Sequence, residues 1–188
     1  STNNPSSLST HANREDFPMR RYLLFCFLAA GLSITAETLR HPITFSEGLP
    51  GWWTNSKLFA VAAGERGPEL VITGDQEQEK GYQRLLGLVK ELPAEQLTGQ
   101  TWNMSFQALI PKLTGAVKVE VRQIGADDKS VSYNTIRLRQ FDQAATWQTF
   151  SLECKMSPKT VKIGIYITAD FLASDDQVRI RQFVLTKP

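Results

Sequence analysis

The clearest pattern in the chain is a strict alternation of apolar and polar residues between Gln100 and Leu109. Trp102, Met104 and Phe106 occupy one parity of this stretch, and polar residues occupy the other. A period of two is typical of a β-strand with one buried face and one exposed face. Because one apolar face needs a second layer to cover it, this strand predicts a layered β-sheet protein.

The same alternation recurs along most of the chain. Further strands are predicted for residues 41–45, 58–63, 69–73, 82–92, 117–122, 133–141, 150–156, 161–167 and 177–186. Residues 82–92 also match helical spacing, and we interpret them as a strand because strands surround them. In the last strand the apolar parity changes between Ile180 and Phe183, which predicts a β-bulge. The pattern predicts an all-β fold, a two-sheet antiparallel β-sandwich of the jelly-roll type, with an immunoglobulin-like sandwich as the alternative.

The parity of each strand also predicts which side chains form the core. Trp102 shares its parity with Met104 and Phe106, so we expect it in the core. Cys154 lies on the inward parity of its strand and is expected to be a small core residue. Trp52 and Trp53 follow a loop rich in glycine, and we expect at least one of them to close the end of the core.

The beginning of the chain has a different composition. Residues 1–18 are rich in Ser, Thr and Asn, so we expect them to be disordered or an over-extended start. Residues 19–36 resemble a signal peptide, with two arginines before an apolar run that closes on Ala36. That run is shorter than the roughly 20 residues of a membrane span, so a permanent anchor is the weaker alternative. We expect residues 37–188 to form one β-sandwich domain that is secreted, periplasmic or on the cell surface, with no membrane attachment after signal removal.

Charge and candidate catalytic groups limit the function. The sequence has 21 Lys and Arg against 19 Asp and Glu, a balance that predicts no binding of nucleic acid or other polyanions. After signal removal His41 is the one remaining histidine, and Cys154 is expected to be buried. Glu120 and Glu153 are the acids at mid-strand positions. These groups give no catalytic constellation, so we expect that the protein is not an enzyme.

The order of several short phrases resembles the secreted carbohydrate-binding modules that have the galactose-binding-domain-like jelly-roll fold. The phrases are residues 45–52, residues 81–92 followed by 99–108, Trp147 to Phe150, and residues 178–185. The resemblance covers most of residues 42–186. It implies a noncatalytic module that binds a glycan or polysaccharide, alone or as part of a larger extracellular enzyme or surface complex.

The resemblance also implies a structural calcium ion, because many such modules hold one with an acidic residue of the opening phrase. Glu47 is the corresponding candidate here, displaced by one place. Arg181 and Gln182 stand where the family commonly has two aspartates, and an arginine at that point would repel a cation.

Candidate sugar contacts are residues of outward parity that carry a ring, an amide or a guanidinium group, because sugar binding combines ring stacking with hydrogen bonds. The candidates are Tyr166, Arg139, Arg137, Asn103 and Gln107 on strands, and Trp53 and Tyr82 from loops at the end of the sheet. In this interpretation Gly164 leaves an open place beside the ring of Tyr166. The alternative function is a structural or adhesive β-sandwich that packs against another protein on an extracellular surface, and a long exposed apolar patch would favour it.

Overall fold

The computed structural model describes residues 38–75 and 82–188 and has the predicted all-β fold. Its first sheet has six antiparallel strands in the order β3-β4-β11-β6-β9, with β1 paired to β11. These strands are β1 (Leu39–Pro42), β3 (Phe59–Gly64), β4 (Gly67–Thr73), β6 (Thr101–Lys112), β9 (Ala144–Lys155) and β11 (Gln177–Lys187). The predicted signal peptide and the boundary at residue 36 lie outside the described residues.

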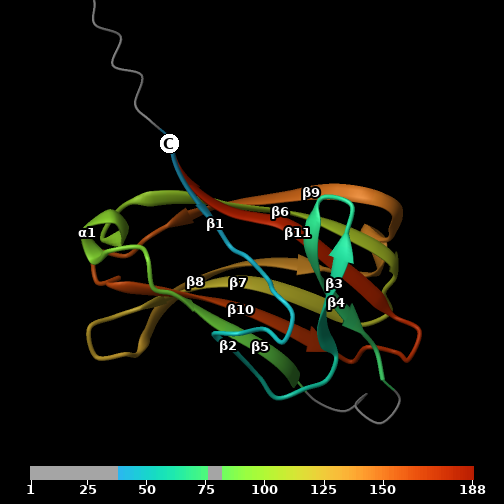
Figure 1. Ribbon diagram of the computed structural model, residues 1–188. Coiled ribbons are helices and arrows are strands. Elements are labelled where there is room, and N and C mark those ends of the chain that lie inside the picture. The colour runs from blue at the N-terminus through green and yellow to red at the C-terminus, as the bar shows by residue number, and fades with distance from the viewer. Residues whose placement is uncertain (1–37, 76–81) are drawn as a thin grey trace, which may run out of the picture. The chain divides into compact units, whose positions relative to one another are not determined.

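The second sheet has five antiparallel strands in the order β2-β5-β10-β7-β8. These strands are β2 (Trp52–Thr54), β5 (Tyr82–Val89), β7 (Ala116–Ile124), β8 (Ser130–Leu138) and β10 (Lys162–Asp170). Figure 1 shows the two sheets as two layers, with β6, β9 and β11 in one layer and β5, β7 and β10 in the other. The prediction of a two-sheet antiparallel sandwich is confirmed.

The core lies between the layers and contains the side chains that the alternation predicts. Trp102, Met104 and Phe106 of β6 are buried, and so are the apolar residues of β7 and β10 that face them. The indole Nε1 of Trp102 donates a hydrogen bond to the backbone oxygen of Gln96 at 2.9 Å. Gln96 belongs to the short helix α1 (Ala94–Leu97), which the sequence pattern does not predict. Trp102 therefore combines a large buried apolar surface with a satisfied polar group.

Several element boundaries differ from the prediction. The strand expected over residues 133–141 ends at Leu138, because the backbone NH of Arg139 donates to the Asp142 carboxylate at 2.8 Å and a 3₁₀ turn (Gln140–Asp142) begins. Strand β2 was not predicted, since three residues are too few to show alternation. The predicted bulge in β11 is confirmed, with a register shift between Arg181 and Val184.

The turn before β11 is held by a buried carboxylate. Asp176 follows Asp175 in a polar stretch of the sequence that predicts a solvated turn, but Asp176 is 2% exposed. Its oxygens accept backbone NH bonds from Thr114 at 2.9 and 3.0 Å and from Ala173 at 3.0 Å, and a hydroxyl bond from Thr114 at 2.8 Å. This carboxylate therefore joins the end of β6 to the start of β11. No helix in the described part of the chain is long and apolar enough to cross a membrane.

Candidate functional site

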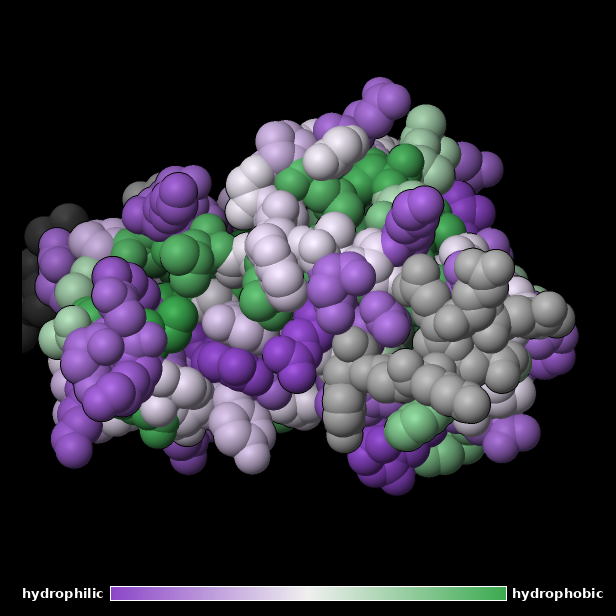
Figure 2. Space-filling model, turned by 90° about the horizontal axis from the view of Figure 1, so that it is seen from below, coloured by the Kyte–Doolittle hydropathy of each residue, from purple (hydrophilic) through white to green (hydrophobic). Residues whose placement is uncertain are grey.

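The candidate site is the outer face of the five-stranded sheet, which is the face turned away from the six-stranded sheet. The strand register places Trp53, Leu86, Tyr166, Glu120 and Thr135 opposite one another in one row across all five strands. We call this set the tyrosine row. Figure 2 shows the molecule from the side of this sheet, with hydrophilic side chains across the middle of the face and hydrophobic patches beside them.

At the centre of this face, an arginine is fixed by a tyrosine and a glutamate. The guanidinium carbon of Arg122 lies 3.9 Å from the ring centroid of Tyr166. Its Nε and Nη2 atoms lie 2.7 and 2.6 Å from Oε1 of Glu120, which also accepts a hydroxyl bond from Thr135 at 3.3 Å through Oε2. A guanidinium held by stacking and by a carboxylate presents its remaining donors in a fixed plane.

The prediction of an open place at Gly164 is wrong. Gly164 is buried, and a Cβ atom added to it would lie 2.8 Å from Cε2 of Tyr166. The tyrosine ring therefore folds over the glycine and occupies the space that a sugar was expected to enter. Glycine at this position lets the ring lie close to the sheet, where Arg122 can stack on it.

A second row crosses the same face two residues away along each strand. Arg84, Thr168, Lys118 and Arg137 are consecutive partners across β5, β10, β7 and β8, and we call them the cation row. Three of its members line a groove of about 240 Å³ together with Glu120, Arg122 and Tyr166; these three members are Arg84, Thr168 and Lys118. The groove thus has basic groups on both sides of the central strand.

The central strand of this face carries two buried polar atoms that have no hydrogen-bond partner in the structure. These atoms are the hydroxyl of Thr168 and Oδ1 of Asp170. The other carboxylate oxygen of Asp170 lies 2.7 Å from Nζ of Lys118. An unpartnered buried polar group costs free energy, so a water molecule or a ligand hydroxyl that reached either atom would stabilise this face.

The predicted sugar contacts fall on two different sheets. Tyr166, Arg137 and Trp53 lie on the outer face of the five-stranded sheet, with Trp53 55% exposed. Asn103 and Gln107 belong to β6 and lie on the outer face of the other sheet, so the structure does not bring them to Tyr166.

The outer face of the six-stranded sheet uses its polar groups for its own network. Gln107 accepts a hydrogen bond from Nε of Arg181 at 3.0 Å, and Arg181 stacks on Trp147 at 3.8 Å. Arg181 and Arg179 also lie 3.7 and 2.5 Å from the buried carboxylate of Glu69. These contacts leave Gln107 engaged in a structural role.

Two other predicted residues lie at the margin of the outer face of the five-stranded sheet. Arg139 lies beyond the end of β8 and lines a hollow of about 650 Å³ with Asp170, Phe141 and Phe171. Both phenylalanines are exposed, at 78% and 66%. Tyr82 begins β5, and its side chain lies outside the described residues. A role for Arg139 and Tyr82 in sugar binding stays a prediction.

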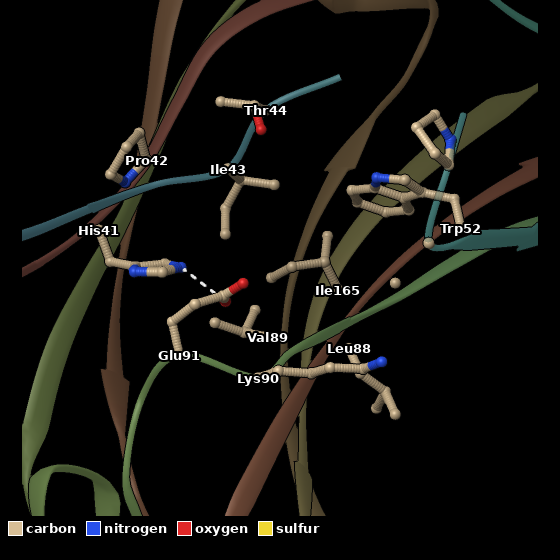
Figure 3. Close-up of a pocket in the computed structure, with 13 residues that line it drawn as sticks. His41, Pro42, Ile43, Thr44, Trp52, Leu88, Val89, Lys90, Glu91 and Ile165 are labelled. Atoms are coloured by element: carbon tan, nitrogen blue, oxygen red, sulfur yellow. Dashed lines mark ion pairs between the residues drawn. The ribbon is translucent and has the colours of Figure 1, made fainter. Parts of the chain in front are cut away.

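Another cavity, of about 520 Å³, opens at the side of the sandwich. Figure 3 shows His41 and Glu91 facing each other at one end and Trp52 at the other, with Ile165 between them. His41 and Glu91 are 3.6 Å apart, and the Trp52 ring packs on Phe45 at a centroid distance of 5.1 Å. As predicted, one of the two tryptophans closes the end of the core: Trp52 packs against the core, whereas Trp53 is exposed.

Solved structures with this fold include proteins that act on or bind polysaccharides. The CBM22-2 xylan-binding domain of Paenibacillus barcinonensis Xyn10C is 12% identical, with a TM-score of 0.52, covering 80% of this chain and 99% of that domain. The CBM22-1-GH10 modules of Clostridium thermocellum endo-1,4-β-D-xylanase 10B, complexed with xylohexaose, are 15% identical, with a TM-score of 0.53 over 78% of this chain and 28% of that one. The chain has the fold of a carbohydrate-binding module.

A further similar structure is the enzymatically active domain of tailspike protein 4 from bacteriophage CBA120. It is 11% identical with a TM-score of 0.55, and the match covers 74% of this chain. The chain spans 20% of the length of that protein. No protein-family model and no curated protein matches the sequence.

The residues where a calcium ion is implied fit a cation poorly. Glu47 is exposed in the loop before β2, and the buried position in the closing strand holds the guanidinium of Arg181 beside Glu69. Within residues 38–75 and 82–188 no three His, Cys, Asp or Glu side chains come together. Calcium at Glu47 stays a prediction, and a calcium-dependent rise in melting temperature that Glu47→Gln removes would demonstrate it.

The groups that could serve catalysis lie apart. Glu120 and Glu153 belong to different sheets. Burial raises the pKa of the Cys154 thiol to about 11, so this residue is a protonated core side chain at neutral pH. His41 lies at the side cavity, opposite Glu91. None of these groups forms a nucleophile and base pair with another.

Proposed function

We propose that this protein binds a polysaccharide without cleaving it, and that the glycan lies across the outer face of the five-stranded sheet. The observation that carries the proposal is the groove at the centre of this face, where the fixed guanidinium of Arg122 lies between exposed rings at the two edges of the sheet. The hydroxyl groups of a sugar chain can bind to the charged donors and acceptors that line this groove.

The exposed rings lie at the two edges of this face. Trp53 on β2 and Tyr133 on β8 are 55% and 65% exposed, and both have outward parity. Four strand spacings separate β2 from β8, which is about 19 Å. Rings at this separation can stack on the apolar faces of different sugars in one glycan chain. Arg122, held by Tyr166 and Glu120, lies between the two rings, where it can bind sugar hydroxyl groups.

The spacing of the acidic groups on this face supports binding without cleavage. Asp170 pairs with Ala116 on β7, four residues from Glu120. At the rise of a β-strand this separation is about 13 Å, whereas the carboxyl pairs of glycoside hydrolases lie roughly 5 to 9.5 Å apart. The two carboxylates are therefore too far apart for the usual acid and base pair.

The destination and partners of the protein are part of the same proposal. The signal-like sequence of residues 19–36 supports export to the periplasm, cell surface or medium. Amino-terminal sequencing of the exported protein should begin at Glu37. A similar module in a solved structure accompanies a GH10 module, which supports a place beside a larger enzyme or surface complex.

The adhesive alternative is favoured by one observation. Leu88 is 53% exposed on the same face as Trp53, so the edge formed by β2 and β5 presents apolar surface. Such a patch could pack against another protein.

An array of immobilised polysaccharides, probed with the purified protein, tests the proposal. We expect binding to at least one polysaccharide and a loss of binding in Trp53→Ala and Tyr133→Ala, with Asn103→Ala on the other sheet as the matched control. Thr168→Val is the sharper variant, because removing a buried unpartnered hydroxyl should not destabilise the free protein. Full binding by Thr168→Val, Trp53→Ala and Tyr133→Ala would exclude this face and leave the adhesive alternative.

A further inference from the structure

The cation row collects positive charge that the overall composition does not reveal. Arg84, Lys118 and Arg137 come from three strands, and the register places Lys118 directly opposite Arg137. Like charges directly opposite in a sheet are destabilising, so this arrangement needs a compensating group. The near-neutral net charge is a sum over all faces of the molecule, and for this reason the sequence alone predicted no polyanion binding.

Carboxylates on the same face neutralise two of its cations. Lys118 pairs with Asp170 at 2.7 Å, and Arg122 pairs with Glu120 at 2.6 Å. In the described part of the chain, no carboxylate forms an ion pair with Arg84 or Arg137, and both residues are exposed. The face thus carries two guanidinium groups in excess over its acids.

We propose that the glycan bound by this face is anionic and carries acid groups on more than one sugar. The inference rests on the proposed function and adds the chemical class of the ligand. The backbones of Arg84 and Arg137 are three strand spacings apart, which is about 14 Å, so two acid groups spaced along one chain match them better than a single acid group. A polymer with repeated acid groups can place one at each guanidinium, where planar donors match the oxygens of either acid.

The centre of the row fits the same ligand. The Thr168 hydroxyl lies between Arg84 and Lys118 in the register and has no partner. A hydroxyl group can donate to an acid oxygen or accept from a sugar hydroxyl. Glu120 and Asp170 are already held by their cations, so they do not oppose an anionic chain as isolated charges.

Affinity electrophoresis of the full chain in gels that contain polysaccharide tests this inference. The probes are polygalacturonate, the same polymer after carboxyl reduction, and dextran sulfate beside neutral dextran, at about 0.05 M and about 0.5 M salt. We expect at least one acidic polymer to be bound at least tenfold more tightly than its neutral counterpart, with the preference lost at high salt. The two acidic probes distinguish a carboxylate from a sulfate ligand.

Charge variants connect the preference to the cation row. The double variant Arg84→Gln, Arg137→Gln should lose the preference for the acidic polymer, whereas Arg66→Gln, Lys159→Gln removes two exposed cations elsewhere and should keep it. Neutral polymers bound as tightly as acidic ones, or a preference that survives in the first double variant, would overturn this inference and leave the proposed function intact. Failure to bind any polysaccharide, neutral or acidic, would overturn both.

Discussion

The guanidinium of Arg122 lies over the ring of Tyr166, 3.9 Å from its centroid, and this contact fixes the centre of the candidate site. Tyr166 is half-buried because its ring folds over Gly164. The ring therefore supports the arginine, and its guanidinium covers one ring face that a sugar would otherwise use. Sugar contacts at the centre of the sheet then come from the guanidinium, while the exposed rings act at the edges.

Tyr166→Ala should weaken glycan binding about tenfold, which corresponds to about 1.4 kcal/mol, because Arg122 loses its stacking partner. Tyr166→Phe keeps the ring and should bind like the wild type. Because the ring also packs on Gly164, we expect Tyr166→Ala to lower the melting temperature as well. Titration calorimetry and thermal melting check the two effects. Equal affinities for the Ala and Phe variants would show that the ring has no role in binding.

Alternation predicted the faces of the strands well, because one buried face imposes a period of two on the sequence. The burial of Trp102, Val119, Ile165 and Cys154 follows from parity alone. Parity does not say which strands share a sheet. Asn103 and Tyr166 therefore have equivalent patterns in the sequence, although they lie on different sheets.

The central groups of the site were missed for a related reason. Arg122, Lys118 and Thr168 act through partners on neighbouring strands, and cross-strand register cannot be read from a single strand. One sequence signal was available, since Lys118, Glu120 and Arg122 alternate in charge on the outward parity of one strand. The ring of Tyr166 over Gly164 could not be foreseen, because it depends on a side-chain rotamer.

Trp102→Ala should lower the free energy of unfolding by about 3 to 5 kcal/mol, as expected when a large aromatic side chain leaves a packed core. The variant also leaves the backbone oxygen of Gln96 without its indole donor. Urea denaturation followed by far-ultraviolet circular dichroism measures the change. A loss smaller than about 1 kcal/mol would contradict the placement of Trp102 in the core.

Asp176→Ala should destabilise the protein by about 3 kcal/mol, because it removes a charged acceptor from several backbone and hydroxyl donors. Asp175→Ala is the matched control. Its carboxylate is exposed and pairs with Lys112 on the surface, so the denaturation midpoint should barely move. Equal midpoints for the two variants would show that the turn before β11 is solvated, as the sequence alone predicted.

Cys154 should be unreactive in the folded protein, because burial raises the pKa of its thiol to about 11. In a Cys26→Ser chain, a thiol reagent at about pH 8 should label Cys154 only after denaturation. The raised pKa also stabilises the fold below the unfolded thiol pKa of about 8.5, and this contribution is lost as the pH rises through the folded value. Rapid labelling of the native protein would contradict the burial of this side chain.

The location of the glycan can be measured directly by following backbone amide resonances of the isotope-labelled protein during titration with an oligosaccharide of the polymer that it binds. We expect the largest shifts in β7 and β10, around Arg122, Tyr166 and Thr168. We expect little change in β6 and β9 of the other sheet. Shifts confined to residues 41–44 and 50–52 would place the glycan in the side cavity and contradict binding on the outer face of the five-stranded sheet.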